Sequence, residues 1–272
     1  MKMNAVEAGL LLNKVREVNP LVHNITNYVV TNFTANGLLA LGASPVMADS
    51  RAEVEEMAAI AGALVLNIGT LNERTAEAMV LAGKAANRNG IPVVLDPVAA
   101  GVTKLRSLTA QRILKEVNVS VIRGNAAEIA SLIGESAESK GVDAGASKGN
   151  VKDLAVRAAR KLDAIIAVTG ATDYITDGRE VVSVDNGDPI LTKVTGTGCL
   201  LSSSVAAFLA IEKNMLHAAS AALAVYGTAA ELAAADTLGK GPGSFQIEFI
   251  NRLSTVTAQD LAERARFEKG GL

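Results

Sequence analysis

Short apolar runs alternate with longer stretches of helical periodicity through the first two thirds of the chain. Helical patterns such as those of residues 51–62 and 72–90 lie between the runs, and the second ends in an Asn-Gly stop. This alternation predicts βαβ units and a parallel sheet. Five runs have the length and composition of buried strands: residues 43–48, 63–69, 91–97, 119–125 and 164–170.

The pattern changes after the fifth run. Short alternating segments follow, separated by Asp177-Gly178 and Asn186-Gly187, and such dipeptides are typical of hairpin turns. We therefore expect antiparallel strands at one edge of the sheet. An all-helical C-terminal third is expected to begin at Cys199.

The expected fold is α/β, a three-layer sandwich with a mostly parallel central sheet, antiparallel edge strands and helices on both faces. A TIM barrel is the alternative, but the two hairpin turns and the helical last third weigh against it. Residues 134–150, rich in Gly, Ser and Ala, are expected to form a surface loop. Since neither a repeat nor a linker divides the sequence, we expect one domain over residues 1–272.

Composition narrows the class of partner. The formal net charge is −2, Trp is absent and aromatic residues make up 3% of the chain, so a nucleic-acid partner is not expected. Residues 217–236 are apolar but interrupted by polar side chains, which favours a buried helix over a membrane span. A single cysteine and an N-terminus without a signal core favour a cytoplasmic protein.

Polar residues stand where the apolar runs end. They are Asn67, Asp96, Arg123, Asn125 and Thr169. Because ligands of open α/β sheets bind beyond the carboxyl ends of the strands, these residues are expected to meet in one crevice.

Each of these residues has a structural alternative to a functional role. Asp96 is either a turn or capping residue or a carboxylate linked to magnesium. Arg123 could bind phosphate bidentately or form a structural salt bridge. Asn125 with Glu128 fits a capping box as well as a metal-associated role, and Thr169 could simply end its strand.

The segment from Lys193 to Cys199 carries the most specific pattern. Gly196 and Gly198 allow a tight turn, and the amides that follow would point from the positive end of a helix toward an anion such as a phosphate. A glycine-rich turn into a packed helix is the alternative. No P-loop sequence occurs, so a nucleotide would be held in another way.

With these pieces assembled, the chain resembles hydroxyethylthiazole kinases of the ribokinase-like superfamily. The resemblance covers almost the whole chain and implies phosphorylation of 4-methyl-5-(2-hydroxyethyl)thiazole with ATP and Mg²⁺, in a homotrimer with active sites between subunits. It rests on residues 20–48 and on the motifs VVLDPVAAG, IRGNAAEI, TKVTGTGCLL and KGPGSFQIEFIN.

The resemblance also implies roles for individual residues. Catalysis falls to Cys199 with Gly196 and Gly198, and magnesium to Asp96 and Glu128. The candidate nucleotide-binding residues are Arg123, Thr169, Asn125, Gly196, Thr197 and Gly198. The candidate thiazole-binding residues are Met47, Gly196, Asn27 and Cys199.

Two positions depart from related sequences. Most ribokinase-like kinases have Asp where this chain has Cys199, and the thiazole branch often has Gly where this chain has Ala99. A helix N-terminus lowers the pKa of a thiol, which would give Cys199 some thiolate character. We expect Cys199 to orient the substrate hydroxyl and to be a mediocre base.

Three other functions are alternatives to this one. A related kinase acting on hydroxymethylpyrimidine or another small vitamin precursor differs only in its substrate, and a non-catalytic ligand sensor on the same fold would fit the exchange of Asp for Cys199. Dinucleotide oxidoreduction is disfavoured because no G-x-G-x-x-G motif follows the first strand.

Overall fold

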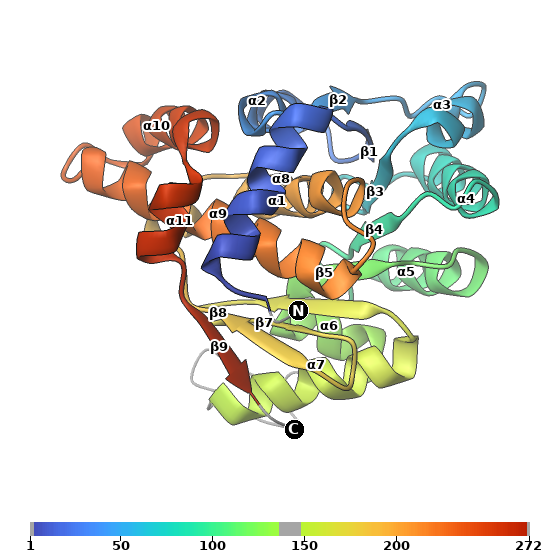
Figure 1. The fold of residues 1–272 in the computed structure, drawn as a ribbon. Coiled ribbons are helices and arrows are strands. Elements are labelled where there is room, and N and C mark those ends of the chain that lie inside the picture. The colour runs from blue at the N-terminus through green and yellow to red at the C-terminus, as the bar shows by residue number, and fades with distance from the viewer. Residues whose placement is uncertain (1–2, 136–147, 271–272) are drawn as a thin grey trace.

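The computed structural model describes residues 3–135 and 148–270, and its elements follow one another along the chain as Figure 1 shows. The strands are β1 (Leu21–Ile25), β2 (Ser44–Val46), β3 (Ala63–Asn67), β4 (Val93–Asp96), β5 (Val121–Asn125), β6 (Ile165–Thr169), β7 (Asp173–Thr176), β8 (Val181–Val184) and β9 (Phe267–Gly270). The helices are α1 (Ala5–Val18), α2 (Thr31–Leu41), α3 (Val54–Ile60), α4 (Glu73–Arg88), α5 (Lys104–Glu116), α6 (Ala126–Leu132), α7 (Lys148–Leu162), α8 (Thr197–Leu209), α9 (Met215–Asp236), α10 (Pro242–Thr255) and α11 (Ala258–Arg264), with a 3₁₀ turn η2 at Pro189–Lys193.

All nine strands join one sheet in the order β2-β1-β3-β4-β5-β6-β7-β8-β9. Strands β1 to β6 pair in parallel, and β7, β8 and β9 continue the sheet in antiparallel pairs. The expected mostly parallel sheet with antiparallel strands at one edge is therefore confirmed.

Helices lie on both faces of this sheet (Figure 1), and each layer covers a hydrophobic core. Helices α3 to α7 cover one face, and α1, α2, α8, α9, α10 and α11 form the layer on the other. Successive side chains of a strand point to opposite faces. In β3, accordingly, Ala63 and Val65 belong to the core beneath α8 and α9, while Leu64 and Leu66 belong to the other.

Helix α9 is the long apolar segment that the sequence marks at residues 217–236. In the described part of the chain it is the one helix long and apolar enough to cross a membrane, but 78% of its most apolar window is buried inside the molecule. Tyr226 packs edge-on against Phe249 of α10, with ring centroids 4.8 Å apart. The expectation of a buried helix is thus confirmed.

The first strand of the sheet was not expected from sequence, because polar residues interrupt its apolar pattern. His23 and Asn24 lie in β1 and are nevertheless buried. The His23 ring nitrogen Nε2 lies 2.7 Å from the carbonyl oxygen of Ala48, and Asn24 accepts a hydrogen bond of 2.7 Å from Ser203 of α8. These partners offset the cost of burying polar groups.

One of the two expected hairpin turns is present. Asp177-Gly178 connects β7 to β8, with Asp177 accepting from two backbone amides and Gly178 in the left-handed region at φ 85°. The prediction for Asn186-Gly187 was wrong, because β8 pairs next with β9 near the C-terminus and the chain passes instead into η2.

Two further boundaries need correction. The last third is not all helical, since β9 returns to the sheet, and its first helix begins at Thr197 rather than at Cys199. Of the loop expected at residues 134–150, residues 136–147 lie outside the described residues, and residues 148–150 already belong to α7.

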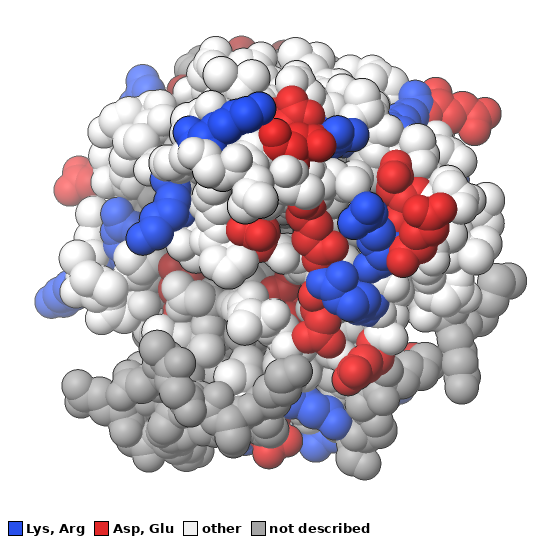
Figure 2. Space-filling view, turned by 90° about the vertical axis from the view of Figure 1, so that its left-hand side faces the viewer, with Lys and Arg blue, Asp and Glu red and all other residues white. Residues whose placement is uncertain are grey.

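Charged side chains of both signs lie side by side on the face that carries α10, α11 and β9. Figure 2 shows blue and red groups intermixed over the described residues of this face. Arg252, for example, pairs with Asp236 and Glu248 there. This face therefore offers no extended field of one sign among its described residues.

Candidate active site

The strand-end residues meet on the face covered by α8. Asn67 and Asp96 are direct neighbours in the register of β3 and β4. Four strand residues point into the core beneath α8 and α9: Ala63, Val94, Val121 and Ala167. Because side chains alternate along a strand, the residues two or four places later point to the same face. Those residues are Asn67, Asp96, Arg123 and Thr169.

Asp96 is buried, with a relative exposure of 1%. Its Oδ2 accepts hydrogen bonds from Asn67 Nδ2 at 2.7 Å and from Ser202 Oγ of α8 at 2.8 Å, whereas Oδ1 has no partner. Burial raises the pKa of this carboxyl from 3.8 to about 6, against the opposing effect of Arg123. Asp96 is thus a buried carboxylate with one oxygen available, and no helix is capped by it.

Arg123 is held by its neighbours rather than by a tight ion pair. Its Nη2 donates a hydrogen bond of 2.7 Å to Thr169 Oγ1, and its Nη1 lies 4.0 Å from Asp96 Oδ2. The guanidinium lies against the backbone of Gly198, where a Cβ would be 2.7 Å from Nη1. The structure therefore places one cation between Asp96, Thr169 and the first turn of α8.

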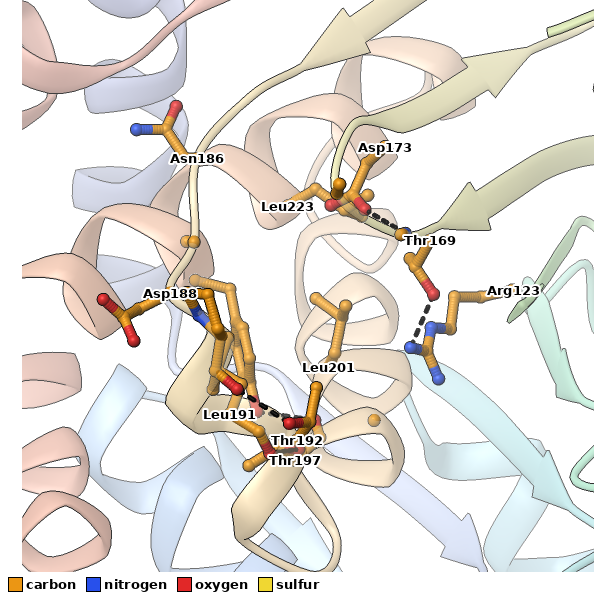
Figure 3. A pocket seen from close by; sticks show the side chains of 17 residues that line it. Arg123, Thr169, Asp173, Asn186, Asp188, Leu191, Thr192, Thr197, Leu201 and Leu223 are labelled. Atoms are coloured by element: carbon orange, nitrogen blue, oxygen red, sulfur yellow. Dashed lines mark hydrogen bonds between the residues drawn. The ribbon is translucent and has the colours of Figure 1, made fainter. Parts of the chain in front are cut away.

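A cavity of about 520 Å³ opens beside this arginine (Figure 3). Arg123 and Thr169 lie along one side of it in Figure 3, and Asn186 and Asp188 lie across from them. The wall is formed by Arg123, Thr169, Gly170, Ala171, Asp173, Asn186, Gly187, Asp188, Pro189, Leu191, Thr192, Thr197, Gly198, Leu201, Leu223, Tyr226 and Gly227.

The first turn of α8 borders the cavity through Thr197 and Gly198. Gly196 caps the helix in the left-handed region at φ 93°, and a Cβ there would lie 2.5 Å from Val30. The Thr197 hydroxyl donates to the Leu191 carbonyl at 3.0 Å, and the Tyr226 hydroxyl donates to the Thr197 carbonyl at 2.6 Å. The first amides of a helix have no acceptor within it, so this fixed turn can receive an anion.

Cys199 is the third residue of α8 and is connected to the strand ends by asparagines. Asn27 Nδ2 donates to Cys199 Sγ at 3.2 Å and also to Asn67 Oδ1 at 3.3 Å. Burial raises the pKa of the thiol, and the nearby Asp96 carboxylate raises it further. This direction is opposite to the thiolate character expected from the position of Cys199 at a helix N-terminus.

Glu128 forms the capping box that the sequence allowed. Its Oε2 accepts from the Asn125 amide at 2.8 Å, while the Asn125 side chain accepts from the Glu128 amide at 2.9 Å. Its Oε1 accepts from the amide of Ala99 at 2.8 Å, and Ala99 is left-handed at φ 57°. Glu128 thus ties the start of α6 to the loop after β4.

The residues present fit a magnesium ion held mainly by phosphates. In the described residues no three His, Cys, Asp or Glu side chains gather in a way that could hold a metal ion. Mg²⁺, however, commonly uses one or two carboxylates together with phosphate oxygens and water. The unpartnered Oδ1 of buried Asp96 suits that role, with Glu128 near enough to raise the pKa of Asp96.

Not every expected residue reaches the cavity. Arg123, Thr169, Thr197 and Gly198 line it, whereas Asn125 is exposed at the end of β5 and is absent from the lining. Gly196, Cys199 and Asn27 are likewise absent from the lining, although Asn27 donates a hydrogen bond to Cys199. Met47 follows β2, at the far end of the sheet order from the cavity wall, and is half-buried.

Three residues that sequence reasoning did not assign to the site belong to it. Ser202 bonds Asp96, and a serine run inside an apolar helix was the available signal. Asp173, buried in the cavity wall, accepts from the Gly170 amide at 2.9 Å, and burial raises its pKa to about 7. Tyr226 lies on α9, far along the sequence, and nothing local marks it.

Similar proteins cover nearly the whole of this chain. The model of the hydroxyethylthiazole kinase family matches residues 12–259. The structure of a hydroxyethylthiazole kinase from Pyrococcus horikoshii OT3 is 43% identical, covers 97% of this chain and 98% of its own, and superimposes with a TM-score of 0.89.

More distant structures share the fold alone. A ribokinase-like superfamily protein from Enterococcus faecalis V583 is 12% identical over 88% of this chain and 87% of its own, with a TM-score of 0.63. A pyridoxal kinase from Staphylococcus aureus, in complex with AMP-PCP, is 17% identical over 77% of this chain and 86% of its own, with a TM-score of 0.58. Together with the nearer match, these structures confirm the expected ribokinase-like sandwich and exclude the TIM barrel. The chain belongs to the hydroxyethylthiazole kinase family.

Proposed function

We propose that the protein transfers the γ-phosphoryl group of ATP to the hydroxyl of 4-methyl-5-(2-hydroxyethyl)thiazole. The observation that carries the proposal is the first turn of α8, where Thr197 and Gly198 line the cavity beside Arg123 and the next residue, the half-buried Cys199, is not part of the lining and accepts a hydrogen bond from Asn27. A nucleotide in the cavity and an alcohol beside the thiol would then meet at one helix N-terminus. Family membership supports the thiazole alcohol as the acceptor.

The cavity is the proposed nucleotide site. Its volume suits a nucleotide-sized ligand. Arg123 would bind phosphate oxygens through its guanidinium, with Thr169 holding its orientation and the amides of Thr197 and Gly198 facing the transferred group. The distant pyridoxal kinase, crystallised with AMP-PCP, supports a nucleotide on this fold.

In the transfer, the substrate oxygen forms a bond to the γ-phosphorus while the bond to the ADP oxygen breaks, and the hydroxyl proton passes late to a phosphate oxygen or to water because the transition state is loose. Mg²⁺, when bound, would neutralise charge on the phosphates, and Asp96 with Glu128 would hold it directly or through water. Arg123 adds a fixed positive charge to the same region. Cys199, kept neutral by burial, would orient the acceptor hydroxyl and would not act as a strong base.

The acceptor side of the turn is the proposed thiazole site. Asn27, Gly196 and Cys199 would form its inner wall, with Met47 contributing an apolar contact. Apolar side chains near it are exposed: Tyr28, Val29, Leu39 and Ile247 are each more than half accessible on or beside α2 and α10, which pack together. A partner subunit on this surface would complete the site, and we propose a homotrimer in the cytoplasm.

One assay tests the function. Release of ADP is measured with the thiazole alcohol or with hydroxymethylpyrimidine, each with and without Mg²⁺. Thiazole-dependent release that needs Mg²⁺ is expected, and light scattering of the same sample gives the subunit number. Release with hydroxymethylpyrimidine alone would assign a related kinase, and binding of thiazole without any turnover would assign a sensor.

A further inference from the structure

A dense polar network lies directly behind the cavity wall that faces Arg123. The loop from Asn186 to Asp188 forms that wall, and it is not part of any regular strand or helix. Two elements hold it from behind: helix α9, through Glu231, and the segment between α11 and β9, through Arg266. These attachments come from positions remote in the sequence.

Glu231 is the centre of the network. Its Oε1 accepts hydrogen bonds from the Gly187 amide at 2.9 Å and from Asn186 Nδ2 at 3.2 Å. Arg266 pairs with the same carboxylate, its Nη2 lying 2.5 Å from Oε1 and its Nη1 3.3 Å from Oε2. The Glu231 side chain is only 17% exposed whereas that of Arg266 is 52% exposed, so the carboxylate is shielded while the guanidinium is partly open to solvent.

The side chain of Asn186 is fully used in holding the loop. Its Nδ2 also donates to the Arg264 carbonyl at 2.9 Å, and its Oδ1 accepts from the Arg266 amide at 2.8 Å. Arg266 further donates to the Asp185 carbonyl. Asn186 therefore lines the cavity, but the hydrogen-bonding groups of its side chain are occupied by partners within the protein.

Helix α9 also sets how closely the loop can approach. Gly227, one turn before Glu231, lies so near the loop that a Cβ would be 2.6 Å from Asn186 Cβ and 2.7 Å from its backbone carbonyl. Gly227 also lines the cavity. One face of α9 therefore contacts the loop closely at Gly227 and is hydrogen-bonded to it through Glu231.

From this geometry we infer that Glu231 and Arg266 are positioning residues for the nucleotide: they fix the Asn186–Asp188 wall and thereby set nucleotide affinity without touching the ligand. The inference rests on the proposed function only in placing the nucleotide in this cavity. A loop held in one conformation loses less entropy when a ligand binds, so its anchors affect the binding constant directly. The acceptor alcohol is proposed to bind beside Cys199, which is not part of the cavity lining, so its binding is not expected to change.

Binding of AMP-PCP, measured by isothermal titration calorimetry, tests the inference. We expect Glu231→Ala to raise the Kd about tenfold, because the loop loses its main anchor. Glu231→Gln, whose amide oxygen can still accept from Gly187, is expected to recover most of the affinity. Gly227→Ala is expected to weaken binding at least as much as Glu231→Ala, because it displaces Asn186.

The matched control is Arg252→Met. It breaks another ion pair of α9, with Asp236, away from the cavity. It is expected to leave the Kd within twofold of the wild type, and melting temperatures of all variants report on folding. In the ADP-release assay, Glu231→Ala should raise KM for ATP and leave kcat and KM for the thiazole alcohol nearly unchanged.

Wild-type affinity in Glu231→Ala would overturn the inference, and so would an equal loss of affinity in Arg252→Met. A fall in kcat together with a rise in both KM values would also overturn it, because it would indicate that the whole protein has loosened. If the wild-type protein binds AMP-PCP but releases no ADP with thiazole, the proposed function fails while the calorimetric comparison still decides the role of Glu231.

Discussion

Asn67 lies between the carboxylate and the thiol of the candidate active site. Its Nδ2 donates to Asp96, and its Oδ1 accepts from the Gly69 amide and from Asn27. These three partners fix the orientation of its amide. Asn27 must then present an N–H group to the sulfur of Cys199, so the hydrogen of the neutral thiol is free to point toward an acceptor alcohol.

This arrangement predicts how Cys199 contributes. Cys199→Ala is expected to lower kcat about 10²-fold, because the alcohol loses its orienting partner. Cys199→Asp is expected to keep or raise kcat, since Asn27 can donate to a carboxylate at that position and a loose transition state needs little help from a base. Steady-state ADP release gives both values, and an inactive Cys199→Asp would contradict the orienting role.

Ala99 predicts a gain in stability. It is left-handed at φ 57°, a conformation that costs a side chain about 1–2 kcal/mol, and glycine avoids that cost while adding some entropy to the unfolded chain. Ala99→Gly is expected to raise the free energy of unfolding by about 0.5–1 kcal/mol in urea titrations.

The control for that change is the neighbouring residue. Ala100 is buried and is not among the residues with positive φ, so Ala100→Gly is expected to destabilise the protein. A loss of stability in Ala99→Gly equal to that in Ala100→Gly would refute the strain argument.

At the scale of elements, helix α8 connects the two halves of the site. It packs against β1, β3 and β4 beneath it and against α2 and α9 beside it. Its serines bond Asn24 and Asp96, and its first turn bears on Arg123. The depth at which α8 sits therefore decides whether these contacts form together.

Gly37 of α2 controls that depth. A Cβ there would lie 2.4 Å and 2.5 Å from the two terminal methyl groups of Leu200, which is fully buried and would have to shift. Gly37→Ala is expected to lower the free energy of unfolding by about 1–2 kcal/mol, the cost of overpacking less the better helix propensity of Ala. The urea midpoint measures it.

Gly243 of α10 provides the comparison, because a Cβ at that position would meet nothing within 4 Å. Gly243→Ala is expected to be neutral or slightly stabilising. Equal losses in the two variants would show that packing against Leu200 is not the cause.

At the scale of the whole molecule, buried carboxylates predict the pH dependence of stability. Burial raises the pKa of Asp173 from 3.8 to about 7, so the folded state holds this proton more tightly than the unfolded chain does. Stability contributed by the protonated group is present below about pH 4 and is lost as the pH rises toward about 7.

Asp173→Asn removes that loss and keeps an oxygen for the Gly170 amide. The free energy of unfolding of the variant minus that of the wild type is expected to be on the order of 2 kcal/mol larger at pH 8 than at pH 4. Urea unfolding at the two pH values measures the change. An equal difference at both would mean that the carboxyl is ionised in the folded protein throughout.

The sequence predicted the parallel sheet and most strand positions because apolar runs of strand length were intact there. It missed β1, whose His23 and Asn24 find polar partners only in the folded protein, and β9, whose four residues include Glu268 and Lys269. The strand-end residues could be predicted because they share one edge of a parallel sheet.

The rest of the site depends on contacts between distant segments. Glu231, Arg266 and Tyr226 meet the cavity wall only through the packing of α9 and the return of the chain to β9. The pKa of Cys199 was expected to fall from its place at a helix start, whereas its burial, which sequence does not show, raises it.

The alternation along β3, β4 and β5 has a consequence for how such a chain can change in length. An insertion or deletion of one residue inside any of these strands would turn Asn67, Asp96 or Arg123 into the opposite core and bring an apolar neighbour to the phosphate side. Point substitutions at the surface have no such effect. Length variation among descendants of this sequence is therefore confined to the connections between elements, while each of these strands keeps its count of residues.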